Sequence, residues 1–199
     1  MGISAQDVKK LREKTGAGMM DCKKALEEAN NDFDEAVATL RKKGIAVAQK
    51  REGKTASEGT IGSYVHAGDQ IGVLVELNCE TDFVARTDDF KAFARELCMQ
   101  IAAQQPKWVS AEDVPPEALD KEREILKQQA LAEGKPEHIV EKMTEGRMRK
   151  FYETYCLLHQ AYIRDDSKTI EDMLNDLVAK TGEKVIVRRF VRYQVGEDL

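Results

Sequence analysis

The side chains that most often carry out chemistry are few and scattered in this chain. Its three histidines do not form the spaced pairs of a metal site, and no serine stands in a nucleophile elbow. Gly16-Ala17-Gly18 lacks the Gly-Lys-Ser/Thr ending of a phosphate-binding loop, which favours a turn between helices. The histidines are His66, His138 and His159. The sequence therefore offers no coherent enzyme site.

Acid pairs and cysteines also have plain interpretations. Asp88-Asp89 and Asp165-Asp166 both precede predicted helices, where the helix dipole favours negative charge, and this is preferred to a metal or acid-base site. The widely spaced cysteines are predicted to be small core residues, with an intermolecular disulfide as the exception. They are Cys22, Cys79, Cys98 and Cys156. We expect neither a bound metal nor a cofactor.

The stretch Glu80-Thr81-Asp82-Phe83-Val84 is the most unusual local feature. It follows a strand-like run, and Thr81-Asp82 is typical of a turn or a helix cap. A large ring then stands beside acids and Arg86. Two interpretations remain open for Phe83. It can anchor the strand-to-helix corner to the core, or it can be an exposed aromatic wedge, the kind of residue that dominates interface energy.

Three short helices are predicted in the first fifty residues. Ser4 begins the first helix with a capping box, and Thr15-Gly16 end it. Asn30-Asn31 end the second helix, and Asp32 can cap the third. Lys42-Lys43-Gly44, cations followed by glycine, is typical of a helix end. We therefore assign a three-helix module to residues 1–47, followed by a polar, basic linker at residues 48–57.

Residues 58–199 predict an α+β core with an antiparallel sheet. Strand-like runs at 60–66 and 71–77 are joined by a hairpin loop, and residues 184–194 alternate as a third strand. The run 87–103 carries a strong apolar stripe at helical spacing, so this helix should cover the sheet. The stripe consists of Phe90, Phe93, Ala94, Leu97, Cys98 and Ile101.

Two thinly apolar helical runs, 117–132 and 137–156, are joined by a turn at 133–136. They predict an antiparallel helical hairpin, a coiled-coil arm at about 116–156 that partly projects from the body. A further amphipathic helix is predicted at 167–180, with Gly182 as its stop. Helices outnumber strands and the strands are hairpin-like or distant, which favours α+β over a parallel doubly wound sheet.

Composition excludes several classes of function. The 199 residues carry a net charge of −5 without long runs of one sign, so a dominant nucleic-acid surface is not expected. No apolar run approaches the ~20 residues that span a bilayer. Residues 1–10 lack the shape of a signal peptide, and we expect a cytoplasmic protein.

Two long motifs resemble the signatures of the elongation factor Ts family. Residues 11–26 (LREKTGAGMMDCKKAL) resemble the first signature, and residues 76–86 (ELNCETDFVAR) resemble the second. The similarity continues through residues 62–66, 142–148 and 190–197, so it covers nearly the whole chain. Two motifs in the right order and separation are far more specific than a lone glycine pattern.

The resemblance implies that the three-helix module at residues 1–47 is ubiquitin-associated-like. It also implies a guanine-nucleotide exchange factor rather than an enzyme. Members of this family bind elongation factor Tu and speed the release of its GDP. By resemblance, Phe83 would push between helices of the partner's GTPase domain and disturb its Mg²⁺ site. Asp82 would be a polar contact, while Thr81 and Val84 shape the loop.

Other contacts are also implied by the resemblance. Met19 and Met20 would touch the GTPase domain, although one of them could instead pack in the small bundle. His66 would meet the partner's distal domain, and Ile163, in segment 162–164, would lie near the GTPase domain.

The resemblance also implies an oligomeric state. Longer members have two related core halves, whereas this chain shows one. Short forms pair as homodimers, which implies a 2:2 complex with elongation factor Tu. The alternative function is an adaptor that binds a ribosome- or chaperone-associated partner through residues 1–47.

Overall fold

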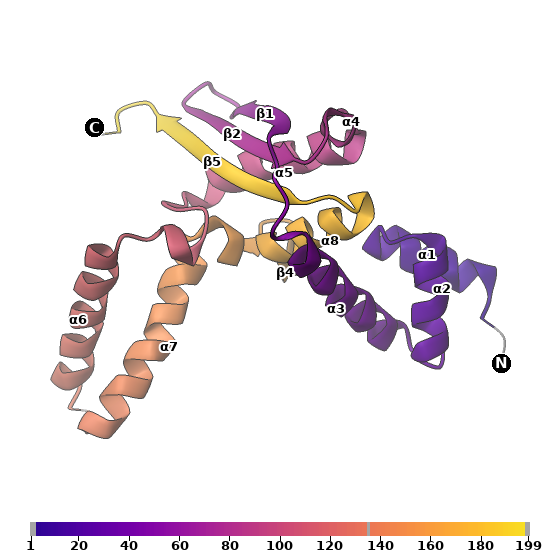
Figure 1. The fold of residues 1–199 in the computed structure, drawn as a ribbon. Coiled ribbons are helices and arrows are strands. Elements are labelled where there is room, and N and C mark those ends of the chain that lie inside the picture. Colours follow the sequence, from indigo (N-terminus) through magenta and orange to yellow (C-terminus); the bar gives the residue numbers. More distant parts are fainter. Residues whose placement is uncertain (1–2, 135, 198–199) are drawn as a thin grey trace.

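The computed structural model describes residues 3–134 and 136–197, and it has an α+β fold (Figure 1). It begins with three helices, α1 (Ala5–Thr15), α2 (Met19–Glu28) and α3 (Phe33–Arg51). Ser4 and Asp32 cap α1 and α3 as predicted, each accepting a hydrogen bond from a backbone N–H of the first turn. These helices share a small core of their own, formed by Leu11, Cys22, Ala25, Leu26, Ala29 and Ala36.

Helix α3 is longer than predicted. It does not end at Gly44 but continues to Arg51, so residues 48–51 of the predicted linker are helical. Gly44 is buried where α3 crosses α8 (Ile170–Thr181), and a Cβ placed on it would lie 3.5 Å from the carbonyl oxygen of Asn175. The glycine therefore lies inside a helix at its crossing with another helix, where an added Cβ would make only ordinary van der Waals contact, and its interpretation as a helix stop was wrong.

A three-stranded antiparallel sheet lies at the centre of the second part of the chain. Its strands are β1 (Glu58–Val65), β2 (Ile71–Cys79) and β5 (Val185–Gln194), in the order β1-β2-β5. Helix α5 (Asp88–Gln104) lies across one face of this sheet, against β1 and β2. The predicted stripe of α5 is buried in full.

The main core lies between this sheet face and the helices α5 and α8. Strand β2 alternates as predicted, with Val73, Val75 and Leu77 pointing into the core. The one-turn helix α4 (Asp82–Ala85) closes the corner between β2 and α5. All four cysteines are buried and free, which confirms their prediction as core residues.

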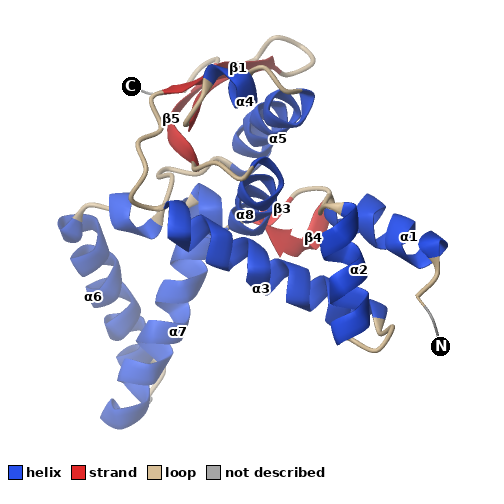
Figure 2. Ribbon diagram, turned by 45° about the vertical axis from the view of Figure 1, so that its right-hand side comes forward, coloured by secondary structure: helices blue, strands red, loops and turns tan. Residues whose placement is uncertain are grey.

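Helices α6 (Pro116–Ala132) and α7 (Glu137–Tyr155) form the predicted hairpin. They lie side by side and extend away from the sheet, as Figures 1 and 2 show. Lys135, in the predicted turn at 133–136, lies outside the described residues. Across the described ranges, no helix is both long enough and apolar enough to cross a membrane.

A small ribbon between α7 and α8 was not predicted. It pairs β3 (Ala161–Tyr162) with β4 (Asp165–Thr169). Residues 167–169 therefore belong to a strand, and the predicted helix start at Ser167 was wrong. Helix α8 begins at Ile170, because Thr169 and Asp172 form a reciprocal capping box there.

Candidate functional site

Phe83 stands exposed on the one-turn helix α4. Its side chain is 78% exposed, whereas its neighbours Val84 and Ala85 are buried in the main core. The helix is thus fixed by one face and presents the ring on the other. The interpretation of Phe83 as a core anchor was wrong, and the exposed ring remains as an aromatic available for contact.

Thr81 caps this helix, and its N–H, hydroxyl and carbonyl groups all form hydrogen bonds. Its hydroxyl oxygen accepts from the N–H of Val84 at 3.4 Å, and its carbonyl accepts from the Cys79 thiol at 3.1 Å. Its own N–H donates to Glu183 Oε2 at 3.0 Å, and its hydroxyl donates to Glu183 Oε1 at 2.7 Å. Sequence reasoning missed Glu183, because nothing in its local pattern points to a residue 102 positions away.

Glu80, on the loop before α4, accepts a hydrogen bond from the loop after α8, whereas Thr81 donates to that loop. Its Oε1 accepts from the backbone N–H of Lys184 at 2.7 Å, and its Oε2 lies 3.5 Å from the Arg51 guanidinium. The loop before α4 and the loop after α8 are therefore joined twice. The end of α3 reaches the same place.

Asp82 is engaged within its own turn. Its carboxylate lies 2.9 Å from the Arg86 guanidinium, in an ion pair that is exposed on both sides. Such pairs contribute little to stability in water. Both charges remain accessible beside the Phe83 ring.

Met19 and Met20 begin α2 and are both exposed, at 59% and 65%. The alternative that one of them packs in the small bundle was wrong. The preceding turn lies against the end of α8, where a Cβ placed on Gly16 would be 4.0 Å from Lys180 Cδ. The loop of Thr81 is bound to Glu183 just beyond the same helix end. The turn before Met19 and the loop before Phe83 therefore both lie near the C-terminal end of α8.

His66 lies elsewhere. It follows β1, at the hairpin end of the sheet, and its Nδ1 lies 2.9 Å from the Tyr64 hydroxyl. The nine residues of β2 separate this end from Thr81, which is roughly 30 Å at a strand's rise per residue. His66 and Phe83 are thus at opposite ends of the sheet.

Ile163 stands in the turn between β3 and β4 and is also exposed. Its N–H donates to the side-chain oxygen of the buried Gln100 at 3.0 Å. Gln100 is near the end of α5, whereas Phe83 precedes the start of that helix. The structure therefore does not bring Ile163 next to Phe83.

The cysteines are poorly suited to nucleophilic chemistry, because the thiolate is the reactive form. Burial raises the pKa of Cys22 and of Cys79, and near Cys79 the Glu183 carboxylate adds to the rise. Burial also raises the pKa of Cys98 and of Cys156 to about 11. Among residues 3–134 and 136–197, no group of three His, Cys, Asp or Glu side chains is placed to hold a metal.

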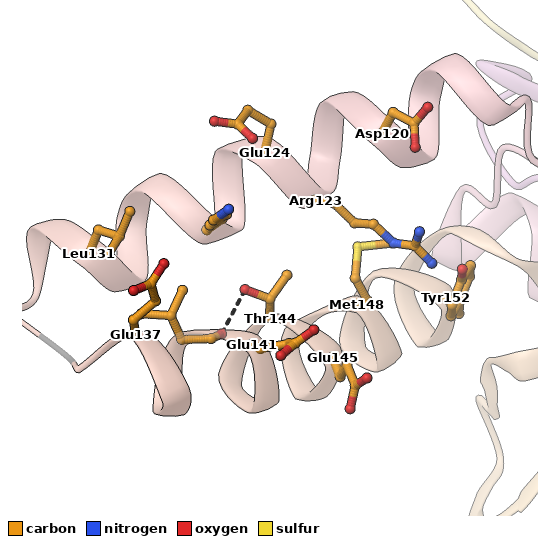
Figure 3. A pocket seen from close by; sticks show the side chains of 12 residues that line it. Asp120, Arg123, Glu124, Leu131, Glu137, Glu141, Thr144, Glu145, Met148 and Tyr152 are labelled. Carbon is orange, nitrogen blue, oxygen red and sulfur yellow. Dashed lines mark hydrogen bonds between the residues drawn. The ribbon is translucent and has the colours of Figure 1, made fainter.

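A groove between α6 and α7 is a second candidate site (Figure 3). Acids from both helices line it, and Arg123 extends into it. The acids are Asp120, Glu124, Glu137, Glu141 and Glu145. The one hydrogen bond drawn there is internal to α7, from the Thr144 hydroxyl to the Val140 carbonyl at 2.9 Å. This is the solvated seam of a helical hairpin.

The chain is similar to known proteins over its whole length. The family model described as elongation factor TS matches residues 3–197. Elongation factor Ts of Thermoanaerobacter sp. (strain X514) is 60% identical over 197 residues, covering 99% of this chain and 97% of the relative. Elongation factor Ts of Syntrophus aciditrophicus (strain SB) is 56% identical over 199 residues, covering 100% and 99%. The chain therefore belongs to the elongation factor Ts family of translation elongation factors.

Proposed function

We propose that this protein is a guanine-nucleotide exchange factor for elongation factor Tu, with Phe83 as its wedge. The observation that carries the proposal is the exposed ring on a short helix whose other face is buried and whose cap is bound on all sides. A fixed aromatic ring can enter a partner's surface without a large ordering cost. Contact by such a ring is a typical interface hot spot.

The wedge acts on the partner's metal, not on one held here. In P-loop GTPases, Mg²⁺ bridges the nucleotide phosphates and a hydroxyl of the phosphate-binding loop. Pushing a ring between helices near that loop would weaken Mg²⁺ coordination and with it GDP binding. Exchange then needs no bond-making by this chain, no cofactor and no catalytic residue.

Met19 and Met20 provide the second contact on the partner's GTPase domain. Their exposure supports this assignment, as does the contact of the preceding turn with the same end of α8 that holds the loop of Phe83. Methionine side chains are flexible and polarisable, which suits an adaptable interface. His66, at the far end of the sheet, would reach the partner's distal domain, and Ile163 would add a contact near the GTPase domain.

Exchange of this kind is a linkage effect. If the factor lowers the affinity of elongation factor Tu for GDP, then GDP lowers the affinity of elongation factor Tu for the factor by the same ratio. The factor speeds the approach to equilibrium, and the excess of GTP over GDP sets the direction.

A second copy of this chain would cover the outer face of the sheet. Helix α5 covers one face, while the register places apolar side chains of all three strands on the other. These are the exposed residues Ile61, Val65, Leu74, Val191 and Tyr193. An exposed apolar patch on a sheet is a typical protein interface, and a twofold axis makes such a patch self-complementary. The homodimer would bind two molecules of elongation factor Tu.

Release of fluorescent GDP from purified elongation factor Tu tests the proposal. We expect the full-length protein to accelerate release in a concentration-dependent manner. If release is unchanged while the protein binds a ribosome- or chaperone-associated partner, the exchange proposal fails and the adaptor alternative replaces it. The assay should contain Mg²⁺ at a fixed concentration. Raising free Mg²⁺ should oppose the acceleration, because the wedge acts by weakening the metal site.

A further inference from the structure

Glu183 holds the loop that carries Phe83 with both of its carboxylate oxygens. One oxygen accepts from the Thr81 backbone N–H at 3.0 Å, and the other accepts from the Thr81 hydroxyl at 2.7 Å. We propose that Glu183 is a positioning residue for exchange, which fixes the Thr81 cap and thereby the direction in which Phe83 points. This inference rests on the proposed role of Phe83 as the wedge.

The loop needs such a support because α4 is very short. It spans only Asp82–Ala85. A single helical turn has no stability of its own, since fixing its backbone costs more than its few hydrogen bonds return. Val84 and Ala85 hold one face of the turn in the core, but Phe83 is too exposed to contribute. The orientation of the turn therefore depends on its cap.

The geometry makes the cap rigid. Two donors of Thr81 meet two separate oxygens of one carboxylate, so neither bond competes with the other. Hydrogen bonds to a charged acceptor are stronger than neutral ones. The remaining carbonyl of Thr81 accepts from the Cys79 thiol and from the N–H of Ala85. A ring on this support is pre-organised, which saves the cost of ordering it on binding.

Helix α8 places Glu183 in this position. It ends at Gly182, whose φ of +70° allows the chain to turn sharply out of the helix. Glu183 follows at once, and the N–H of Lys184 is bound by Glu80 in return. The direction of Phe83 is thereby set by the end of α8, against which the turn before Met19 also lies. One helix end thus aligns both proposed contacts on the GTPase domain.

GDP release from elongation factor Tu tests the role of Glu183 in the full-length protein. Removing two charge-assisted hydrogen bonds in Glu183→Ala should slow accelerated release by about tenfold. Glu183→Gln should recover most of the loss, because its amide oxygen still accepts from the Thr81 N–H. Glu117→Ala, at an exposed glutamate of α6 that lies outside the groove, is the control, and with it GDP should be released at the unmodified rate.

A double-mutant cycle with Phe83→Ala separates positioning from general damage. If Glu183 acts through the ring, Glu183→Ala should have less than about a twofold effect once Phe83 is removed. An equal loss in both backgrounds, or no loss in the unmodified background, would overturn the proposal.

Amide hydrogen–deuterium exchange in the free protein tests whether Glu183 holds the Thr81 loop, independently of nucleotide exchange. Glu183→Ala should speed exchange at Thr81 by at least about tenfold, because its N–H loses its acceptor. An unchanged rate there would overturn the proposal whatever the release assay gives. If Phe83→Ala leaves GDP release unchanged, the proposed wedge function fails. The rate of amide hydrogen exchange at Thr81 then decides alone whether Glu183 holds the loop.

Discussion

Phe83 and Phe90, which lie seven positions apart, have opposite surroundings. Phe83 is 78% exposed on α4, whereas Phe90 is fully buried at the start of α5. Burying a ring of this size stabilises a fold by several kcal/mol, while an exposed ring contributes little until a partner covers it. The two positions therefore allow the proposed role of Phe83 in binding to be tested separately from the role of Phe90 in folding.

Phe83→Ala should reduce the acceleration of GDP release at least about tenfold, because the wedge is lost. Circular dichroism and the melting temperature should stay nearly unchanged, since the ring is solvated in the free protein. Phe90→Ala is the matched control and should lower the free energy of unfolding by about 3–5 kcal/mol. A collapse of the fold in Phe83→Ala would show that the ring supports the core after all.

At the residue scale, the sequence drew attention to the loop of Phe83 but not to the residue that supports it. Phe83 stood out because a large ring beside charges is unusual, and its exposure agrees with that signal. Glu183 gave no such signal, because one glutamate after a helix stop is common. Its role arises only when the fold brings two loops together.

At the element scale, α3 and α8 are held together by one ion pair beside their crossing. Arg41 Nε donates to Asp172 Oδ1 at 2.8 Å, and a terminal nitrogen of the same guanidinium meets Oδ2 at 2.5 Å. Asp172 also accepts from the N–H of Thr169 in the capping box of α8. Burial alone would raise the pKa of Asp172, but the hydrogen bonds from Thr169 and Arg41 outweigh it, and the pKa is lowered.

Asp172→Asn should therefore destabilise the protein by about 1–2 kcal/mol at pH 7, discounted because Arg41 is half exposed. A carboxyl whose pKa is lowered on folding stabilises above its unfolded pKa of about 3.9. This stability is lost as the pH falls through the folded value. The difference between the variant and the unmodified protein, measured by urea unfolding, should accordingly shrink below about pH 4.

Asp166→Asn serves as the control for this series. Asp166 is an exposed acid of β4, so its change should stay within about 0.5 kcal/mol. A destabilisation by Asp172→Asn that persisted undiminished in acid would contradict the ion-pair account and point to the shape of the side chain instead.

Elements with a strong apolar period were predicted well, whereas a polar strand and a glycine at a helix crossing were not. The stripe of α5 and the alternation of β2 are both buried as expected. Strand β4 was missed because its residues are polar and mostly exposed, so its sequence lacks the alternation of apolar and polar residues that indicates a strand. Gly44 was misread because a glycine at a helix crossing and a glycine at a helix end look alike in sequence.

At the scale of the whole molecule, the outer sheet face is the surface on which we propose that a second copy of the chain packs. Leu74 lies at its centre on β2, opposite Val191 on one neighbouring strand and Ser63 on the other. Leu74 and Val191 are both exposed in the single chain. The sheet face, and not only the open edge that one missing core half would leave, thus offers apolar area for a second copy.

We expect the unmodified protein to sediment as a dimer and Leu74→Lys to sediment as a monomer, because two lysines facing each other across a dry interface would be uncompensated charges. Ile125→Lys, at an equally exposed apolar residue of α6, is the matched control and should remain dimeric. Reductant should not change the result, since all four cysteines are buried and free. A dimer that survives Leu74→Lys would move the interface away from this face, and a dimer that dissociates only in reductant would restore the intermolecular disulfide.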